Sequence, residues 1–501
     1  MKQLRFLCVI LSLIFLLCSD ANAQKTSVRK YPSLFWEITG KGLKKPSYLF
    51  GTMHVSSKMV FHLSDSFYHA LKSVDAVALE LNPEKWQGDM FKMQKAQMNL
   101  AHFANSEMVD YINDQSFQLP GYEENLKRAL SEEPTVVNSL LYRSYQSRAD
   151  FEENTYLDLY IYQTGRKLGK LATGVEDYEE TEKLMMEAYQ DMAKEKRRRN
   201  VNTDGESMFD LDKKMQEAYR KGDLDLMDSL ETITNISPAF TEKFLFKRNE
   251  IQANSIDTIL KKRSLFVGVG AAHLPGERGV IQLLRKKGYK LRPIFMQDSD
   301  ASQKEEVDKL RVPVTFRSFA SDDGFIKMQV PGSLFKREEA RANESWQYAD
   351  MNNGSYYMLT RVRNHAAMLG DNEKVVFRKL DSLLYENVPG RILKKTAINK
   401  GGFTGYDITN KTRRGDLQRY NIFVTPFEVL VFKMSGNDSY VEGKEAEAFF
   451  SSISLTTKDK AEKWLQFEPQ QGGFAVSLPH NPNKTLNKKN NDRINRWEYE
   501  A

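Results

Sequence analysis

Cysteine is almost absent from this sequence. The 501 residues contain only two, Cys8 and Cys18, and both precede residue 24. A chain cleaved after residue 23 would therefore form no disulfide and would offer no thiolate to a metal or a substrate. Any metal site in such a chain must use His, Asp and Glu side chains.

Long apolar runs are also missing, except near the N-terminus. There a positively charged end precedes the apolar stretch 6–17, and Ala21-Asn22-Ala23 supplies the small residues of a cleavage site. This pattern predicts a secretory signal peptide over residues 1–23, because the apolar stretch is too short to span a membrane comfortably. We expect an exported bacterial protein, periplasmic or secreted, with no transmembrane segment after cleavage.

The sequence lacks a large excess of one charge. Lys and Arg number 73 against 67 Asp and Glu, and the basic run 196–199 follows a stretch with charges of both signs, which is typical of a solvated helix end. The stretch VGVGAAHLPG (267–276) has neither the G-x-G-x-x-G pattern nor the P-loop lysine. The sequence therefore predicts no nucleic-acid partner and no nucleotide phosphate site.

The first 300 residues follow the pattern of an α/β domain. Apolar residues recur at helical spacing between 85 and 250, interrupted by a predicted strand at 170–177. Strand–helix–strand units flank this region, at 47–52, 64–73 and 74–81, and at 265–269, 277–287 and 290–295. Such units imply parallel strands. We predict a mixed, largely parallel sheet with a large helical insertion over residues 24–300.

The pattern changes after the first domain. Alternating, aromatic-rich runs and a helix near 444–451 predict an α+β module with an antiparallel sheet over 312–456. Residues 464–501 resemble the beginning of this module, with Gly473-Phe474 and Trp497 answering to Gly324-Phe325 and Trp346. A second copy that stops after its opening hairpins cannot bury a core, so we expect the natural chain to continue.

Two of the seven histidines share one context. His54 follows a predicted strand in Gly51-Thr-Met-His54, and His273 follows another in Gly270-Ala-Ala-His273. Side chains at the carboxyl ends of parallel strands face a shared crevice, so these histidines can converge although 219 residues separate them. Glycine suits the sharp exit from a strand and lets another group approach the backbone. The other histidines lack this context: His62, His69, His102, His365 and His480.

Two glutamates end predicted strands and can reach the same crevice. Glu80 closes the strand 74–81, and Glu176 closes the strand 170–177. Two imidazoles and one or two carboxylates are typical ligands of Zn, Mn, Co or Fe, which activate water for hydrolysis. Without a metal, the same groups can act as general base and acid. For Glu176 a simpler interpretation stays open, because its acidic neighbours also suit a helix N-terminus.

Two further charged residues are candidates for supporting roles. Arg248 can stabilise developing negative charge, or it can form a purely structural ion pair. Asp158 can orient a histidine by a hydrogen bond, or it can lie on the surface of a helix. The sequence alone leaves both alternatives open for each residue.

Several segments of the chain together resemble the TraB/GumN family of bacterial pheromone-shutdown and GumN proteins, which has the animal TIKI proteins as relatives. The likeness covers about residues 33–296 and rests on both G-x-x-H motifs, DAVALELNP, TYLD, KRN and the terminal strand–helix–strand segment. It implies a fold akin to erythromycin-esterase and haem-binding ChaN-like proteins. It also implies a metalloprotease centre, with Mn or Co favoured, at His54, Glu80 and His273, supported by Arg248. The chain departs from the family's G-L-E-T at TGVED, where Glu176 stands.

We therefore expect an exported metal-dependent hydrolase that acts as a peptidase on a peptide or an exposed protein segment. The expected ligands of its Mn, Co or Zn ion are His54, Glu80, His273 and Glu176. Two alternatives stay open. One is a non-catalytic protein that captures a peptide or a small ligand such as haem in the same crevice, and the other is a metal-independent, esterase-like hydrolase.

Overall fold

The computed structural model describes most of the chain between residues 29 and 500. The described ranges are 29–53, 63–105, 122–133, 155–195, 208–234, 237–295, 302–338, 343–364, 371–413, 415–456, 465–469, 473–478, 483–489 and 495–500. The predicted signal peptide and His54 lie outside these ranges, so what was expected of them stays a prediction.

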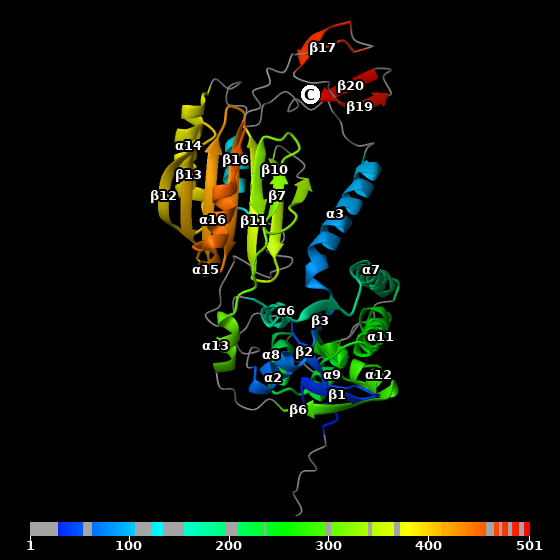
Figure 1. Ribbon diagram of the computed structural model, residues 1–501. Helices are drawn as coiled ribbons and strands as arrows, with labels where there is room; N and C mark the ends of the chain where they lie inside the picture. The colour runs from blue at the N-terminus through cyan, green and yellow to red at the C-terminus, as the bar shows by residue number, and fades with distance from the viewer. Residues whose placement is uncertain are drawn as a thin grey trace, which may run out of the picture.

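A six-stranded mixed sheet forms the centre of the first domain (Figure 1). Its strands are β1 (Phe35–Gly40), β2 (Ser47–Thr52), β3 (Ala76–Leu79), β4 (Leu171–Gly174), β5 (Leu265–Gly270) and β6 (Tyr289–Ile294). Their order is β4-β3-β5-β2-β1-β6, and the neighbours β4, β3, β5 and β2 are all parallel. The prediction of an α/β domain with a mixed, largely parallel sheet is confirmed.

Two strands differ from the prediction. β1 lies in a segment where no strand was predicted, and it pairs antiparallel with β2. β6 was expected to close a unit beside β5, but it pairs antiparallel with β1 at the edge of the sheet. The reason is that β3 and β2 occupy both sides of β5, so the nearest free edge for β6 is that of β1.

Helices cover the sheet and fill the predicted insertion. The first domain contains α2 (Asp65–Ser73), α3 (Pro83–Asn105), α6 (Leu157–Lys167), α7 (Tyr178–Lys194), α8 (Met208–Arg220), α9 (Leu224–Thr234), α10 (Pro238–Thr241), the π-helical turn η2 (Glu242–Lys247), α11 (Arg248–Leu260), the 3₁₀ turn η3 (Ala271–His273) and α12 (Val280–Lys286). Among the described residues, we find no helix with the length and apolar character needed to cross a bilayer.

An aromatic cluster holds β2 and β5 side by side. The ring of Phe67 on α2 lies edge-on at 5.3 Å from that of Phe50 on β2 and at 5.2 Å from that of Phe266 on β5. All three side chains are buried. Burial of one phenylalanine contributes about 1.5–3 kcal/mol, so this cluster is a substantial part of the core. It fixes the relative position of the two strands that carry the G-x-x-H motifs.

The second domain contains an antiparallel sheet of seven strands, in the order β12-β13-β14-β15-β11-β10-β9. These are β9 (Phe335–Glu338), β10 (Asn343–Asp350), β11 (Ser355–Arg363), β12 (Arg391–Lys400), β13 (Phe403–Lys411), β14 (Leu417–Val424) and β15 (Glu428–Gly436). A smaller sheet joins β7 (Arg317–Ala320), β8 (Ile326–Val330) and β16 (Ser454–Leu455). The helices of this domain are α14 (Glu373–Asn387), α15 (Asp438–Val441) and α16 (Lys444–Ser452), whereas α13 (Ser302–Lys309) packs on α2 and α6 of the first domain. The predicted antiparallel sheet and the helix near 444–451 are confirmed.

One helix of the predicted insertion packs on the second sheet. The buried residues of α4 (Tyr122–Ser131) share a core cluster with α14, β14 and β15. At the end of α4, the Nζ atom of the buried Lys433 donates a hydrogen bond of 3.1 Å to the carbonyl oxygen of Glu132. Burial lowers the pKa of Lys433. The second core therefore contains residues from a segment that precedes much of the first domain.

Further contacts join the two domains. Helix α3 extends from the first sheet towards the second (Figure 1), and the rings of Phe91 and Phe335 stack at 4.8 Å. Gln87 exchanges hydrogen bonds with the backbone of Ala349 on β10. On α6, the Tyr162 hydroxyl donates to the side-chain oxygen of Asn352 in the β10–β11 turn. The two domains are thus fastened to each other by α3 and α6.

The last described residues form two hairpins. β17 (Leu465–Phe467) pairs with β18 (Val476–Leu478), and β19 (Asn483–Lys489) pairs with β20 (Asn495–Glu500). The hairpins β7–β8 and β9–β10 follow one another in the same way at the beginning of the second domain. This order of hairpins agrees with the predicted internal repeat, which stays a prediction.

Candidate metal centre

Three potential ligands come from the ends of neighbouring parallel strands. Glu80 directly follows β3, Glu176 lies two residues after β4, and His273 ends η3, three residues after β5. Leu79 and Gly174, the last residues of β3 and β4, are paired. Just beyond them, the backbone N–H of Glu176 donates to the carbonyl oxygen of Glu80 at 2.8 Å. The topology of the sheet therefore brings these side chains to one edge.

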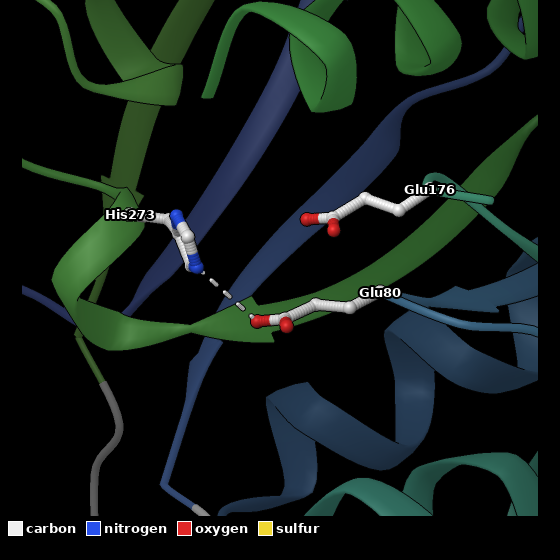
Figure 2. Close-up of side chains that lie close together, drawn as sticks. All are labelled: Glu80, Glu176 and His273. Carbon is white, nitrogen blue, oxygen red and sulfur yellow. Dashed lines mark ion pairs between the residues drawn. The ribbon is translucent and has the colours of Figure 1, made fainter. Parts of the chain in front are cut away.

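The three side chains point towards one another (Figure 2). One ligand atom of each lies within 4.8 Å of the others, and His273 Nε2 is 3.5 Å from Glu80 Oε1. Two ligand atoms at about 2.2 Å from one tetrahedral ion lie about 3.6 Å apart. The cluster would therefore have to close by about 1 Å around one ion. Two carboxylates and an imidazole without a thiol are a donor set that fits Mn, Co or Zn.

Glu80 is fixed by contacts to both of its carboxylate oxygens. Its Oε1 accepts a hydrogen bond of 2.7 Å from the backbone N–H of Gly270, and its Oε2 accepts one of 2.7 Å from Arg248 Nη2. A Cβ atom at Gly270 would lie 3.2 Å from Glu80 Oε1. A larger residue would therefore push the carboxylate away, which is a physical reason for glycine at this position of the motif.

Glu176 is the most deeply buried carboxylate of the cluster, with 1% of its side chain exposed. Its Oε2 accepts hydrogen bonds from Arg248 Nε at 2.9 Å and from the Thr181 hydroxyl at 2.8 Å, and its Oε1 accepts one from Gln252 at 2.5 Å. The helix N-terminus that was considered for Glu176 belongs to its neighbour, because the Asp177 side chain caps α7. Glu176 faces the site.

Arg248 lies between the two carboxylates. Its side chain is 8% exposed and forms ion pairs with both Glu80 and Glu176. Burial opposes its charge, but the two carboxylates outweigh this effect and raise the pKa of Arg248. Its guanidinium therefore stays charged between the two carboxylates. Arg248 follows the π-helical turn η2, a feature that is frequent at functional sites.

Asn249 orients the imidazole of His273. Its Oδ1 lies 2.6 Å from His273 Nδ1, and its amide nitrogen donates to the carbonyl oxygen of Arg278 at 2.9 Å. With the amide fixed in this way, Oδ1 accepts and Nδ1 carries the proton. The lone pair of Nε2 then faces Glu80. Sequence reasoning gave Asn249 no role, because only the structure shows that Arg248 and Asn249 at the start of α11 are buried.

Replacement of Asn249 by leucine is expected to weaken divalent-metal binding about 10- to 100-fold, because residues that hold a ligating histidine contribute that much to affinity. Competition with a chelating dye measures the affinity. Asn254→Leu is the matched control, since Asn254 is an exposed residue of the same helix. If Asn249→Leu binds the metal as tightly as Asn254→Leu, Asn249 does not orient the ligating histidine and contributes only to packing.

The structure also describes the approach to His54. Thr52, the last residue of β2, pairs with Gly270 of β5, and its hydroxyl donates to Asp158 Oδ1 at 2.6 Å. Asp158 is 4% exposed, so the interpretation that it lies on a helix surface is wrong. The hydroxyl of Tyr219 donates to the carbonyl oxygen of Gly51 at 2.9 Å. Asp158 and Tyr219 thus brace the strand end that precedes His54, whose own position lies outside the described residues.

Comparison with known proteins identifies one family model, that of the TraB/PrgY/gumN family, which matches residues 34–293. This is just over half of the chain. The chain is also similar to the zebrafish (Danio rerio) protein named metalloprotease TIKI2, with 22% identity over 350 residues. The match covers 58% of this chain and 66% of TIKI2, which is less than two thirds of the latter's length.

Solved structures resemble the chain only distantly. A Bacteroides thetaiotaomicron protein is 11% identical, with a TM-score of 0.19, over 31% of this chain and 54% of its own. PsbP from Synechocystis sp. PCC 6803 is 11% identical, with a TM-score of 0.20, over 28% of this chain and 94% of its own.

Proposed function

Because the chain belongs to the TraB/PrgY/gumN family, we propose that it is a metal-dependent hydrolase, and specifically a peptidase. The observation that carries this proposal is the convergence of Glu80, Glu176 and His273 at the carboxyl edge of the sheet. In this proposal His54 completes the ligand set, and the ion is Mn, Co or Zn. The name of the relative TIKI2, a metalloprotease, points in the same direction.

The residues of the site have separate tasks in this proposal. A bound divalent ion would lower the pKa of a water molecule and polarise a carbonyl group. Glu80 Oε1 faces the imidazole and accepts the N–H of Gly270, and its Oε2 is held by Arg248. Oε1 would hold the ion or, as a general base, accept a proton from a nucleophilic water. Asn249 keeps the Nε2 lone pair of His273 directed into the site. The guanidinium of Arg248 supplies a fixed positive charge that offsets the two carboxylates.

The substrate and the location of the protein are parts of the same proposal. We infer that a peptide or an exposed protein segment is cleaved, in line with the family's protease relatives. We also infer that the protein is exported to the periplasm or secreted, on the basis of the signal-peptide pattern at residues 1–23. The fold likeness to erythromycin-esterase and ChaN-like proteins belongs to this proposal as well.

One observation favours a second candidate, a metal-independent hydrolase. Arg248 already places a positive charge within hydrogen-bonding distance of both Glu80 and Glu176. An arginine in this position can stabilise negative charge that develops on a substrate without an ion. In that case His273 and Glu80 would serve as general acid and base.

Chelation separates these candidates. The purified protein is analysed for Mn, Co and Zn, and the cleavage of a mixture of unrelated peptides is followed by mass spectrometry. We expect EDTA to abolish cleavage and a divalent ion to restore it, whereas EDTA presaturated with the ion that the protein contains, the control, should have little effect. Cleavage that resists EDTA would support the metal-independent hydrolase. Ligand binding without turnover, whichever metal is added, would support a non-catalytic binding protein.

A further inference from the structure

A hollow of about 450 Å³ lies at the amino edge of the first sheet, opposite the candidate metal centre. The β1–β2 turn and the α11–β5 turn form its walls, and the adjacent strands β2 and β5 begin there. Each of these strands has six residues, so the hollow and the metal centre lie about 20 Å apart along the strands. The hollow is therefore separate from the site described above.

Positive charge dominates the lining of this hollow. Six cationic side chains line it against a single carboxylate, Asp75, while a second carboxylate, Asp257, lies in contact with two of the cations. The six cations are Lys41, Lys44, Lys45, Lys261, Lys262 and Arg263. Even with both carboxylates counted, the local net charge is +4, compared with +6 for the whole chain of 501 residues. The net positive charge of this one surface is thus two thirds as large as that of the whole chain.

Both carboxylates already have structural tasks. Asp257 accepts hydrogen bonds from the Lys41 ammonium at 2.6 Å and the Tyr289 hydroxyl at 2.8 Å, and it pairs with Lys261 at 2.9 Å. These contacts join the two turns and hold the pKa of Asp257 well below its usual range. Asp75 accepts from the backbone and hydroxyl of Ser264, which lowers its pKa. These two carboxylates therefore hold the turns that form the hollow in place.

Three of the six cations take no part in these ion pairs. Lys44, Lys262 and Arg263 are exposed, and no acidic partner is found for them among the described residues. In the β1–β2 turn, Lys41 has a positive φ of 47° between two glycines that also have positive φ. A lysine in this left-handed conformation is strained, and such strain is typical of functional positions. The turns thus hold an excess of positive charge on a preformed concave surface.

We propose that this hollow binds a phosphate-bearing ligand with at least two negative charges. Arg263 can form paired hydrogen bonds with phosphate oxygens, and the lysines supply charge from both turns. The only apolar side chains in the lining are Leu43, half-buried, Leu260, buried, and the ring of Tyr289, also buried, so recognition is electrostatic. The phosphate belongs either to a soluble diphosphate or to the headgroup of an anionic lipid.

The test uses the whole chain and two probes at low ionic strength. Calorimetry measures the binding of pyrophosphate, and co-sedimentation measures binding to vesicles of phosphatidylglycerol and phosphatidylcholine, with pure phosphatidylcholine as reference. The variant Lys44→Gln/Lys262→Gln/Arg263→Gln is expected to bind at least about tenfold more weakly than the native chain. Its matched control, Lys327→Gln/Lys394→Gln/Lys411→Gln, removes the same charge from exposed positions on the second domain.

The two probes identify the source of the phosphate. Binding of pyrophosphate that the first variant loses and the control keeps supports a soluble ligand. Binding that is confined to anionic vesicles, with the same dependence on the variant, supports a lipid headgroup. The proposal is overturned if neither probe binds, or if both triple variants bind as tightly as the native chain. Added salt should weaken true binding, which confirms its electrostatic origin in the native protein.

Discussion

Arg248→Met is expected to lower the free energy of unfolding of the metal-free protein by about 3–5 kcal/mol, because it leaves two buried carboxylates without their counter-charge. Glu80 and Glu176 are both paired with this guanidinium, and Glu176 is 1% exposed. Urea denaturation monitored by circular dichroism measures the loss. Methionine keeps much of the side-chain volume and a similar helix propensity, so the effect reports the charge.

The same variant tests whether a metal binds between the carboxylates. With Arg248 removed, Glu80 and Glu176 lose the guanidinium that lies between them, so Mn²⁺ should raise the melting temperature of the variant more than that of the native chain. Arg378→Met, at an exposed position on α14, is the control and should change neither quantity measurably. If the variant is as stable as the native chain, the carboxylates are stabilised by other contacts. If Mn²⁺ has no greater effect on it, the ion does not bind there.

His273→Ala is expected to abolish metal binding and to reduce peptide cleavage at least about 100-fold, because it removes the only imidazole of the cluster that the structure describes. Metal content and the initial rate of cleavage are measured on the same preparation. The expected loss is in kcat, since the change affects the reacting atoms rather than the remote contacts of a substrate.

The control for this variant is His69→Ala, which makes the same chemical change at an exposed position on α2. The control should keep both metal and activity. Because His273 is buried beside Asn249, the variant's melting temperature must be recorded as well. A folded His273→Ala protein that still binds metal and cleaves peptides would refute the proposed centre.

The residues at the carboxyl edge of the sheet were the part of the structure that could best be predicted from the sequence. Apolar strands that end in Gly-x-x-His or in glutamate can be recognised from the sequence, and parallel strands must present such ends on the same edge. This reasoning named Glu80, Glu176 and His273, and Arg248 was named separately as a supporting charge. The structure brings the four residues together. Their catalytic role stays a prediction. His54 cannot be compared, because it lies outside the described residues.

Contacts that depend on the packing of distant helices were not predictable. Asn249 meets His273 because α11 packs beside the end of β5, and nothing in the local pattern of α11 shows which of its polar residues turns inward. The position of β6 depends in the same way on β1, whose pairing decides which edge of the sheet is free. Local periodicity indicates the type of an element, whereas its neighbours follow from the whole fold.

The packing of α4 makes the second domain discontinuous along the chain. The polypeptide leaves the first domain through α3, contributes α4 to the second core, returns to the first sheet with α6, and leaves again after α13. A polypeptide limited to residues 312–456 would lack Tyr122, Leu126 and Leu130, and would leave their apolar contacts on α14 and the sheet open to water. The second core therefore requires a segment from far earlier in the chain, and α4 cannot complete its packing until the second sheet is made. The two domains are coupled in folding as well as in space.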